Sequence, residues 1–216
     1  MKKLLLSLFV VSAISSLAAG DFNVYGKFGV DLNSKFSKIK DEDGTSLPLP
    51  TKAKSGYSFF LEGTTVVAPN TEFGVGIGYI TRKGKNFSYY DDFFTPARRI
   101  SGRMPSYNSI PLYLTAKYNF NTGIFNPYIK FDLGYSFNKL NNENEYDGKS
   151  KVSYDIDLSK ATNGLYTGLS VGVEYNNFLT ELSYVYTKAK LKWQDGDSSK
   201  WDNKTIRLSV GYKFNF

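Results

Sequence analysis

Residues 204–216, KTIRLSVGYKFNF, are the last of the chain and decide its fold. From Ile206 to Phe216 every second residue is apolar, and the residues between them are polar or glycine. This period of two is that of a β-strand with one apolar face. An open edge strand so rich in aromatic residues would aggregate. We therefore expect this strand to pair on both sides, as it does in a closed barrel.

The sequence here resembles the last strand of bacterial outer-membrane β-barrels, which ends in Phe after a series of alternating apolar residues. In that group the terminal strand is the signal that the barrel-assembly machinery recognises. The resemblance implies that Tyr212, Phe214 and Phe216 form the assembly signal of this chain. It also implies that the protein lies in the outer membrane of a Gram-negative bacterium.

The first twenty residues, MKKLLLSLFVVSAISSLAAG, have the pattern of a signal peptide. A basic pair precedes an apolar run, and small residues follow at 18–20, where we expect cleavage. A membrane anchor is the alternative, but the apolar run is shorter than the ~20 residues that a spanning helix needs. Removal of 1–20 leaves a predicted barrel domain at 21–216, with 25 basic and 20 acidic residues and a net charge of +5. So mild a charge does not indicate a nucleic-acid partner.

Seven further segments show the same alternation as the last strand: 22–33, 55–67, 72–82, 109–120, 127–138, 162–175 and 178–188. The connections alternate between short turns and long polar segments, and the long ones are 34–54, 83–108, 139–161 and 189–203. Outer-membrane barrels have short periplasmic turns at one end and longer extracellular loops at the other. The sequence therefore predicts an all-β fold, a single eight-stranded antiparallel transmembrane up-and-down barrel with four extracellular loops.

A soluble barrel has the same period with its apolar face turned inward, so the period alone leaves both orientations open. Aromatic residues of the apolar face gather near both ends of the predicted strands, with Leu, Val, Ile and Ala between them. Phe73 and Tyr175 lie at the short-turn end, for example, and Phe59 and Tyr135 lie toward the loops. Two such girdles are typical of a lipid-facing surface. We therefore expect the apolar face to point toward lipid and the polar face toward the lumen.

The polar face carries the first candidate site, a set of charged residues that would share the lumen: Lys27, Asp31, Glu62, Arg82, Lys117, Lys130, Asp132, Glu174, Glu181, Arg207 and Lys213. An eight-stranded barrel is just wide enough for side chains to fill. Charges buried there must pair or be hydrogen-bonded.

Within this set, the residues nearest the strand centres form the predicted central cluster, in which acids face bases: Glu62, Glu174 and Glu181 against Lys117 and Arg207. One interpretation is a salt-bridge plug that fixes the strand register and fills the lumen. The other is a gate or ion path. The plug is favoured because no surplus of small residues accompanies the charges. The small barrels that this chain resembles also carry a charged interior cluster.

Catalysis is the second candidate. The outer-membrane barrel enzymes available for comparison, lipid A deacylases, palmitoyltransferases and omptin proteases, rely on an active-site histidine, and this sequence has neither histidine nor cysteine. Ser–His and Asp–His arrangements are therefore excluded, and we expect no enzyme activity. Acidic runs at 41–43 and 143–147 lack the spacing of a calcium loop. We accordingly expect no catalytic residues, no metal site and no cofactor.

The third candidate is the long segment 83–108, in which basic residues are interleaved with Phe and Tyr. Such a mixture can bind polyanions or stack on sugars. It can equally contact the phosphates of the surrounding outer leaflet without a specific partner, and both interpretations stay open. The basic residues concerned are Lys83, Lys85, Arg98, Arg99 and Arg103.

The predicted mature chain as a whole resembles the small outer-membrane β-barrel superfamily, which includes OmpA-type transmembrane domains, OmpX-like proteins and opacity proteins. The resemblance implies a monomer surrounded by lipopolysaccharide and other outer-membrane lipids, and no peptidoglycan-binding domain is expected after the barrel. Two functions stay open. One is a structural and surface-interaction role through the four loops, with host or cell-surface ligands. The other is a narrow porin-like channel for small solutes or ions.

Overall fold

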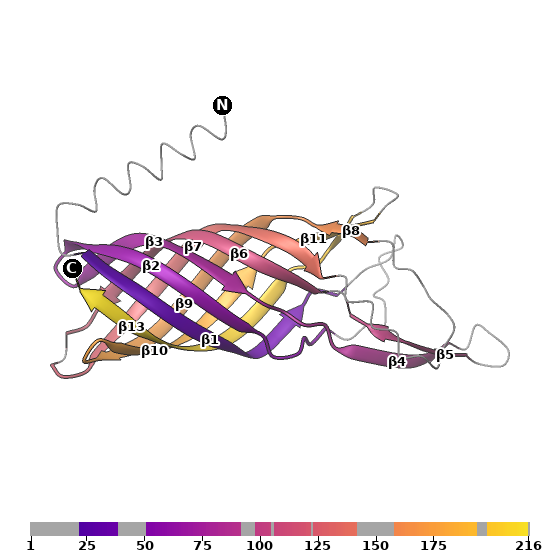
Figure 1. Cartoon of the computed structure of the whole chain (residues 1–216), viewed down its shortest axis with the longest axis horizontal. Coiled ribbons are helices and arrows are strands. Elements are labelled where there is room, and N and C mark those ends of the chain that lie inside the picture. Colours follow the sequence, from indigo (N-terminus) through magenta and orange to yellow (C-terminus); the bar gives the residue numbers. More distant parts are fainter. Residues whose placement is uncertain are drawn as a thin grey trace, which may run out of the picture.

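The computed structural model describes residues 22–38, 51–91, 98–104, 106–121, 123–141, 158–193 and 198–215. Eight long strands close into one antiparallel barrel (Figure 1), which confirms the predicted fold. No helix among the described residues is long and apolar enough to cross a membrane. The barrel strands are β1 (Phe22–Phe36), β2 (Tyr57–Ala68), β3 (Thr71–Ile80), β6 (Ser106–Asn119), β7 (Asn126–Asn141), β9 (Gly164–Tyr175), β10 (Phe178–Thr187) and β13 (Asn203–Asn215).

The last strand, β13, pairs on both sides, as its sequence predicts. The order around the barrel is β1-β13-β10-β9-β7-β6-β3-β2, and β2 in turn pairs with β1. Val210 of β13, for example, lies opposite Phe28 of β1 and Thr180 of β10. β13 therefore joins the first strand of the barrel to the others and removes the open edge that an aromatic strand could not tolerate.

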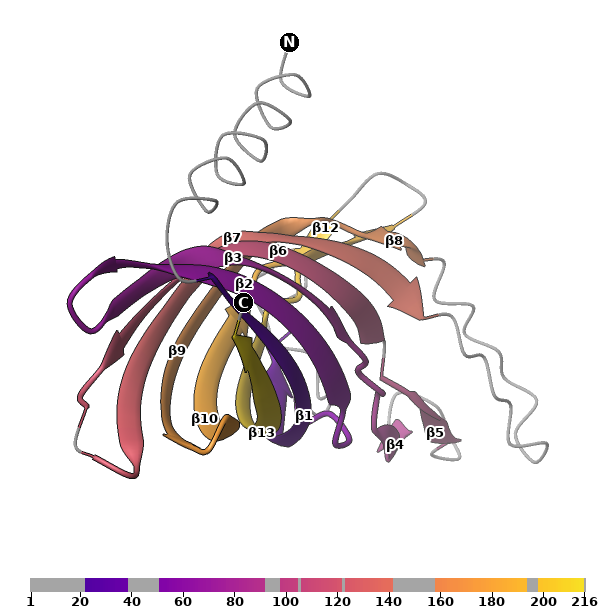
Figure 2. The same ribbon diagram turned by 60° about the vertical axis from the view of Figure 1, so that its left-hand side comes forward.

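Tight turns join the strands at one end of the barrel. Asn70 lies in the turn between β2 and β3, and Asn176 and Asn177 form the turn between β9 and β10. Their φ values are positive, at 65°, 46° and 68° respectively. Asn tolerates this left-handed conformation better than most residues, which suits a short hairpin connection. β13 ends beside these turns, and Figure 2 shows this end turned toward the viewer.

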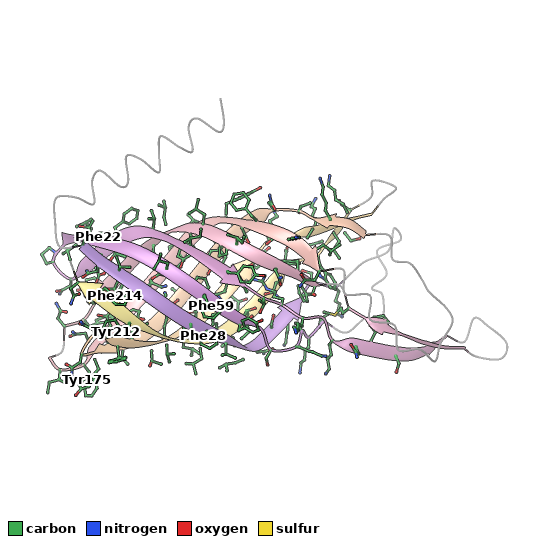
Figure 3. The ribbon with its side chains drawn as sticks, viewed as in Figure 1. Phe22, Phe28, Phe59, Tyr175, Tyr212 and Phe214 are labelled. Carbon is green, nitrogen blue, oxygen red and sulfur yellow. The ribbon has the colours of Figure 1, made fainter. Side chains whose placement is uncertain are left out.

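Apolar side chains cover the outside of the barrel, and mainly polar ones fill its inside. In β10, Leu182 is exposed, and its neighbours Glu181 and Ser183 are buried. This contrast confirms that the apolar face points outward, where a membrane protein meets lipid. Figure 3 shows the outward direction for six aromatic side chains: Phe22, Phe28, Phe59, Tyr175, Tyr212 and Phe214.

A bulge in β1 changes one predicted side-chain direction. Simple alternation places Asn33 in the lumen, but the register of β1 against β13 shifts between Asp31 and Asn33, and Asn33 is exposed. Because a bulge adds one residue to one strand, the residues beyond it change face. Ser34 and Phe36 are buried as a result, and Phe36 reaches the loop end of the interior.

Short strands extend the barrel at the end opposite the tight turns, where the sequence predicts loops. β4 (Asn86–Asp91) and β5 (Arg98–Arg103) form a hairpin. β8 (Leu158–Ala161), β11 (Lys190–Trp193) and β12 (Ser198–Lys200) form a three-stranded sheet in the order β12-β11-β8. Both extensions lie at the far end from the carboxyl terminus in Figure 1.

An apolar cluster fills the loop end of the interior, and we call it the aromatic cap. The rings of Phe36 and Trp201 stack with centroids 5.0 Å apart and an angle of 7° between their planes. The Tyr107 hydroxyl donates a hydrogen bond of 3.2 Å to the main-chain oxygen of Trp201. The buried members of the aromatic cap are Phe36, Met104, Tyr107, Ala161, Ala189, Leu191 and Trp201.

Candidate functional site

Among the described residues, the inward positions of the eight barrel strands, together with Arg82 just beyond β3, bring twelve charged side chains into the lumen. Six are cationic and six are carboxylates, so their formal charges sum to zero. All are buried except Lys213, which is partly exposed at the short-turn end. They are Lys27, Arg82, Lys117, Lys130, Arg207 and Lys213 on the basic side, and Asp31, Glu62, Glu72, Asp132, Glu174 and Glu181 on the acidic side.

A central cluster joins two lysines and two glutamates from β1, β2, β7 and β10. Glu62 Oε1 lies 2.6 Å from Lys27 Nζ and 2.9 Å from Lys130 Nζ. Glu181 Oε2 lies 3.4 Å and 3.2 Å from the same two ammonium groups. The Tyr113 hydroxyl donates a further hydrogen bond of 2.7 Å to Glu62. Lys130 Nζ also lies 3.3 Å from Asp132 Oδ2. Because each of the four charges meets at least two of opposite sign, these side chains compensate one another where little water can enter.

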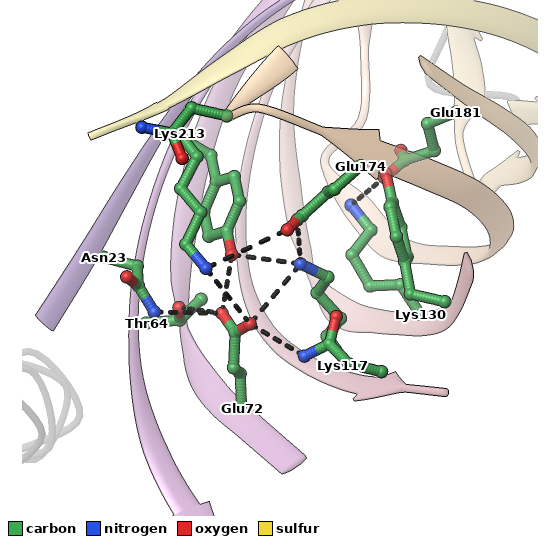
Figure 4. Close-up of polar contacts among 12 residues, drawn as sticks. Asn23, Thr64, Glu72, Lys117, Lys130, Glu174, Glu181 and Lys213 are labelled. Carbon is green, nitrogen blue, oxygen red and sulfur yellow. Dashed lines mark hydrogen bonds and ion pairs between the residues drawn. The ribbon is translucent and has the colours of Figure 1, made fainter. Parts of the chain in front are cut away.

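A second cluster lies toward the short turns and centres on Glu72 and Lys117 (Figure 4). Lys117 Nζ forms an ion pair with Glu174 and lies 3.4 Å from Glu72 Oε1. Lys213 approaches both carboxylates, at 4.0 Å from Glu72 and 3.9 Å from Glu174. Glu72 also accepts hydrogen bonds from Thr64 at 2.6 Å, Tyr25 at 2.8 Å and Asn119 at 2.9 Å. Such a set of partners satisfies both oxygens of a buried carboxylate.

A third group lies toward the loops, beyond a layer of buried apolar and aromatic side chains that includes Phe60, Tyr113 and Tyr166. Arg207 Nε donates a hydrogen bond of 2.8 Å to Asp31 Oδ1 across the pair β1–β13. The guanidinium carbon of Arg207 lies 5.1 Å from the centre of the Phe60 ring. The interior is therefore layered, with a hydrophobic layer between two charged ones.

Arg82 connects this third group to the aromatic cap. Its guanidinium donates hydrogen bonds to Ser109 at 2.5 Å, Thr187 at 3.1 Å and Asn203 at 3.0 Å, all of them neutral side chains. Its guanidinium carbon also lies 5.1 Å from the centre of the Tyr107 ring. Stacking and neutral hydrogen bonds together stabilise a buried cation.

Little space remains between these side chains. A cavity of about 10 Å³ is lined by residues of the central cluster and of the second cluster, among them Tyr25, Glu62, Lys117 and Glu181. Such a volume holds about one water molecule. Neighbouring side chains occupy the space beside the glycines of the inner face. A Cβ on Gly78, for example, would come within 2.3 Å of the Phe60 ring. The charged interior therefore fills the lumen.

The structure places Glu62 and Glu181 in the central cluster and Lys117 and Glu174 in the second cluster. It separates Arg207 from both. The expectation that Arg207 faces the central acids is wrong, because its partner is Asp31 on the neighbouring strand. Lys27 and Lys130 take that place instead. These pairings depend on how far each strand is shifted against its neighbour, and alternation within a single strand carries no information on that shift.

Sequence reasoning missed Glu72 altogether. It lies next to the turn that joins β2 to β3, and it is not among the lumen residues expected from the sequence. The signal was present, since Glu72 continues the series of inward positions that Gly74 and Gly76 occupy in β3. Its buried carboxylate has the most partners in the second cluster, where it accepts hydrogen bonds from Thr64, Tyr25 and Asn119 and lies near Lys117.

Two other predicted sites lie partly outside the described residues. Tyr212 and Phe214 are exposed on the lipid side of β13, and Phe216 lies outside the described residues. In the predicted basic segment, Lys83 and Lys85 are exposed. Arg98, Arg99 and Arg103 belong to β5 by their backbone, and their side chains are not described. The predicted signal peptide at 1–20 also lies outside the described residues. None of these roles is tested by the geometry.

Comparison with known sequences gives a single consistent result. A profile of the family described as outer membrane protein beta-barrel domain matches residues 4–214. A protein of Pasteurella multocida (strain Pm70), which carries the name uncharacterized protein PM1543, is 36% identical over 233 residues. That match covers 99% of this chain and 98% of the relative.

Comparison with solved structures bears on the fold. The outer membrane protein OprG from Pseudomonas aeruginosa superposes with a TM-score of 0.55 at 17% identity, over 92% of this chain and 96% of that chain. Neisserial surface protein A gives a TM-score of 0.49 at 15% identity, over 89% and 97% of the two chains. At this identity the likeness to OprG concerns the fold alone, and it agrees with the closed barrel.

Proposed function

The chain belongs to the outer membrane protein β-barrel family, and on that premise we propose that it is a non-conducting, monomeric barrel with a structural and surface-interaction role. Its place is the outer membrane of a Gram-negative bacterium. In this role the interior side chains close the lumen, and the loop end contacts other molecules.

The observation that carries this proposal is the filled lumen. The central cluster spans the interior from β2 to β10, and the cavity beside it has room for about one water molecule. A conducting pore needs a continuous wet path through the barrel. Lumen charges that sum to zero, beside a cavity that holds about one water molecule, support a plug rather than a filter.

The aromatic cap supports the same proposal from the other end. Trp201, Leu191 and Tyr107 are almost fully buried at the loop end, above Arg82. An ion entering from that side would have to displace these apolar side chains. On this proposal the lumen is closed at two levels, by the charged clusters in its middle and by the apolar side chains of the aromatic cap at the loop end.

The closed set of strand pairs supports a monomer. β1 pairs with both β2 and β13, so the hydrogen-bonding edges of the barrel strands are used within the chain. A barrel of this kind needs no second copy to complete its sheet. We also assign Tyr212, Phe214 and Phe216 to recognition by the barrel-assembly machinery, as the alternating strand implies.

Conductance of the refolded protein in planar lipid bilayers tests the proposal. We expect no stable channels from the wild-type protein. The matched control is Glu62→Ala/Lys130→Ala, which removes one charge of each sign and so keeps the balance while it empties part of the central cluster. This variant should conduct, which proves that the assay detects an opened barrel. Stable channels from the wild-type protein would instead support the narrow porin-like function.

Cysteine labelling tests which end faces outward, and the chain has no native cysteine to interfere. Ser198 in β12 and Asn121 in a short turn are both exposed. On intact cells, Ser198→Cys should react with a membrane-impermeant thiol reagent and Asn121→Cys should not. Reaction at Asn121 alone would invert the topology and remove the basis for a surface role.

A further inference from the structure

The three-stranded sheet β12-β11-β8 has two unlike faces. Leu191 of β11 and Ala161 of β8 lie opposite each other and are buried in the aromatic cap. The neighbouring positions on the three strands point the other way and are exposed, and each of them that carries a charge is a lysine: Lys160, Lys190, Lys192 and Lys200. The sheet is therefore amphipathic, with a basic outer face.

The lysines of this face meet in pairs. Lys190 lies directly opposite Lys200, and Lys192 lies directly opposite Lys160. Like charges in directly opposite positions destabilise a sheet. Asp202, which is buried, compensates Lys200 at 3.1 Å, and Lys192 has an interaction within the chain. A fold that keeps such pairs on an exposed face is suited to an anionic partner.

A crevice of about 580 Å³ lies between this sheet and the end of β7. Lys139 of β7 lines it together with Lys160 and Lys192, and Tyr135 of β7 forms part of its wall. Tyr135 is 49% exposed on the lipid-facing surface and packs against Phe137, with ring centroids 5.5 Å apart. The crevice thus combines basic side chains with an aromatic surface that continues onto the outside of the barrel.

We infer that this crevice binds the phosphorylated head group of a glycolipid of the outer leaflet, the lipid A part of lipopolysaccharide. The ammonium groups of Lys139 and Lys160 would contact its phosphates, and its acyl chains would lie along Tyr135 and Phe137. Anionic phosphates at a membrane surface attract lysines that lie beside them, and aromatic rings prefer the same depth. The inference rests on the proposed function in one respect, namely that the loop end faces outward.

Binding in vesicles tests the inference. The protein is refolded into phosphatidylcholine vesicles that contain a small fraction of diphosphorylated lipid A, and the lipid A retained by the purified protein is measured. Lys139→Gln/Lys160→Gln should lower the affinity by about tenfold or more, since each lysine beside an anionic surface contributes to binding. Lys35→Gln/Lys204→Gln is the matched control, because it removes the same charge from two exposed lysines that lie opposite each other on β1 and β13, outside the crevice, and its affinity should stay close to that of the wild type.

Two further arms separate the head group from other sources of phosphate. Dephosphorylated lipid A should bind the wild type as weakly as the double variant binds the intact lipid. Inorganic phosphate at millimolar concentration should not displace the lipid, because it lacks the acyl chains that contact Tyr135. Equal affinity of the crevice variant and the wild type, equal losses in the two variants, or binding that survives dephosphorylation would each overturn the inference. Heat-modifiable migration confirms that every variant is folded, and the conductance assay, done without lipid A, reports separately on the proposed function.

Discussion

The charged interior and the aromatic cap fill the same lumen, but they differ in origin as well as in chemistry. The long barrel strands supply the interior charges apart from Arg82. The cap instead combines Phe36 and Tyr107 of the barrel strands with residues of the short strands and the connections beside them, namely Ala161, Ala189, Leu191 and Trp201. In the interior, the loss of one partner leaves a buried charge without compensation. In the cap, the loss of one ring removes contacts and buried area only. We therefore expect the charged interior to be more sensitive to a single substitution than the aromatic cap.

The largest effect is expected from Glu62→Gln. Glu62 compensates Lys27 and Lys130 together, so its neutralisation leaves two buried ammonium groups short of a partner. We expect the free energy of unfolding in lipid to fall by about 3–5 kcal/mol, measured by urea titration of tryptophan fluorescence.

The double variant Glu62→Gln/Lys27→Met sharpens this result. It removes a charge of each sign, so it should cost clearly less than the sum of the two single changes. Additive costs would mean that the pair does not act as a compensated unit, and the contrast between interior and cap would be lost.

A smaller and more local effect is expected from Trp201→Ala. Truncation of a Trp in a closed core costs about 3–5 kcal/mol, but the cap lies at the end of the barrel, where a segment can open without the rest. Hydrogen exchange should therefore become faster in β11 and at the start of β13, while the strand centres keep their protection. Trp201→Phe, which retains a ring to stack on Phe36, is the control. Equal loss of protection along the whole barrel would show that cap and interior unfold as one unit.

The smallest effect is expected from Lys190→Gln, and it has the opposite sign. Lys190 lies opposite Lys200, and removal of one of two like charges should stabilise the sheet by about 0.2–1 kcal/mol. The gain should shrink as salt is added, because exposed charges are screened. Salt-independent destabilisation would show that the pair is not repulsive.

Most of the barrel follows from its sequence because strand period and turn chemistry are local properties. Alternation such as that of Ile206–Phe214 identifies a strand from its own residues, and Asn176–Asn177 marks a hairpin without reference to anything distant. The aromatic residues at both ends of the strands also fix the lipid-facing side. These features need no knowledge of which strands are neighbours.

The partners inside the lumen could not be predicted in the same way. Whether Arg207 meets Glu62 or Asp31 depends on the shift between strands, which is a property of the closed sheet. The three-stranded sheet of β8, β11 and β12 could not be predicted for a related reason, although Asp195-Gly196 in segment 189–203 favours an extension of the last hairpin. Its strands are only three or four residues long, so even the alternation of Lys190–Trp193 is too brief to predict a strand, and their buried face is defined only by contact with Trp201 and its neighbours.

The ion pair between Asp31 and Arg207 has a consequence for the order of assembly. The two residues are 176 positions apart, and they lie directly opposite each other where β1 meets β13. This seam cannot form until almost the entire chain has been delivered to the membrane. A slip of two residues would set Arg207 against Gly29 and Asp31 against Thr205. Both charges would then be buried without a partner of opposite sign. The pair therefore favours the correct register, because only in that register does each of the two charges lie beside its partner when the last strand closes the barrel.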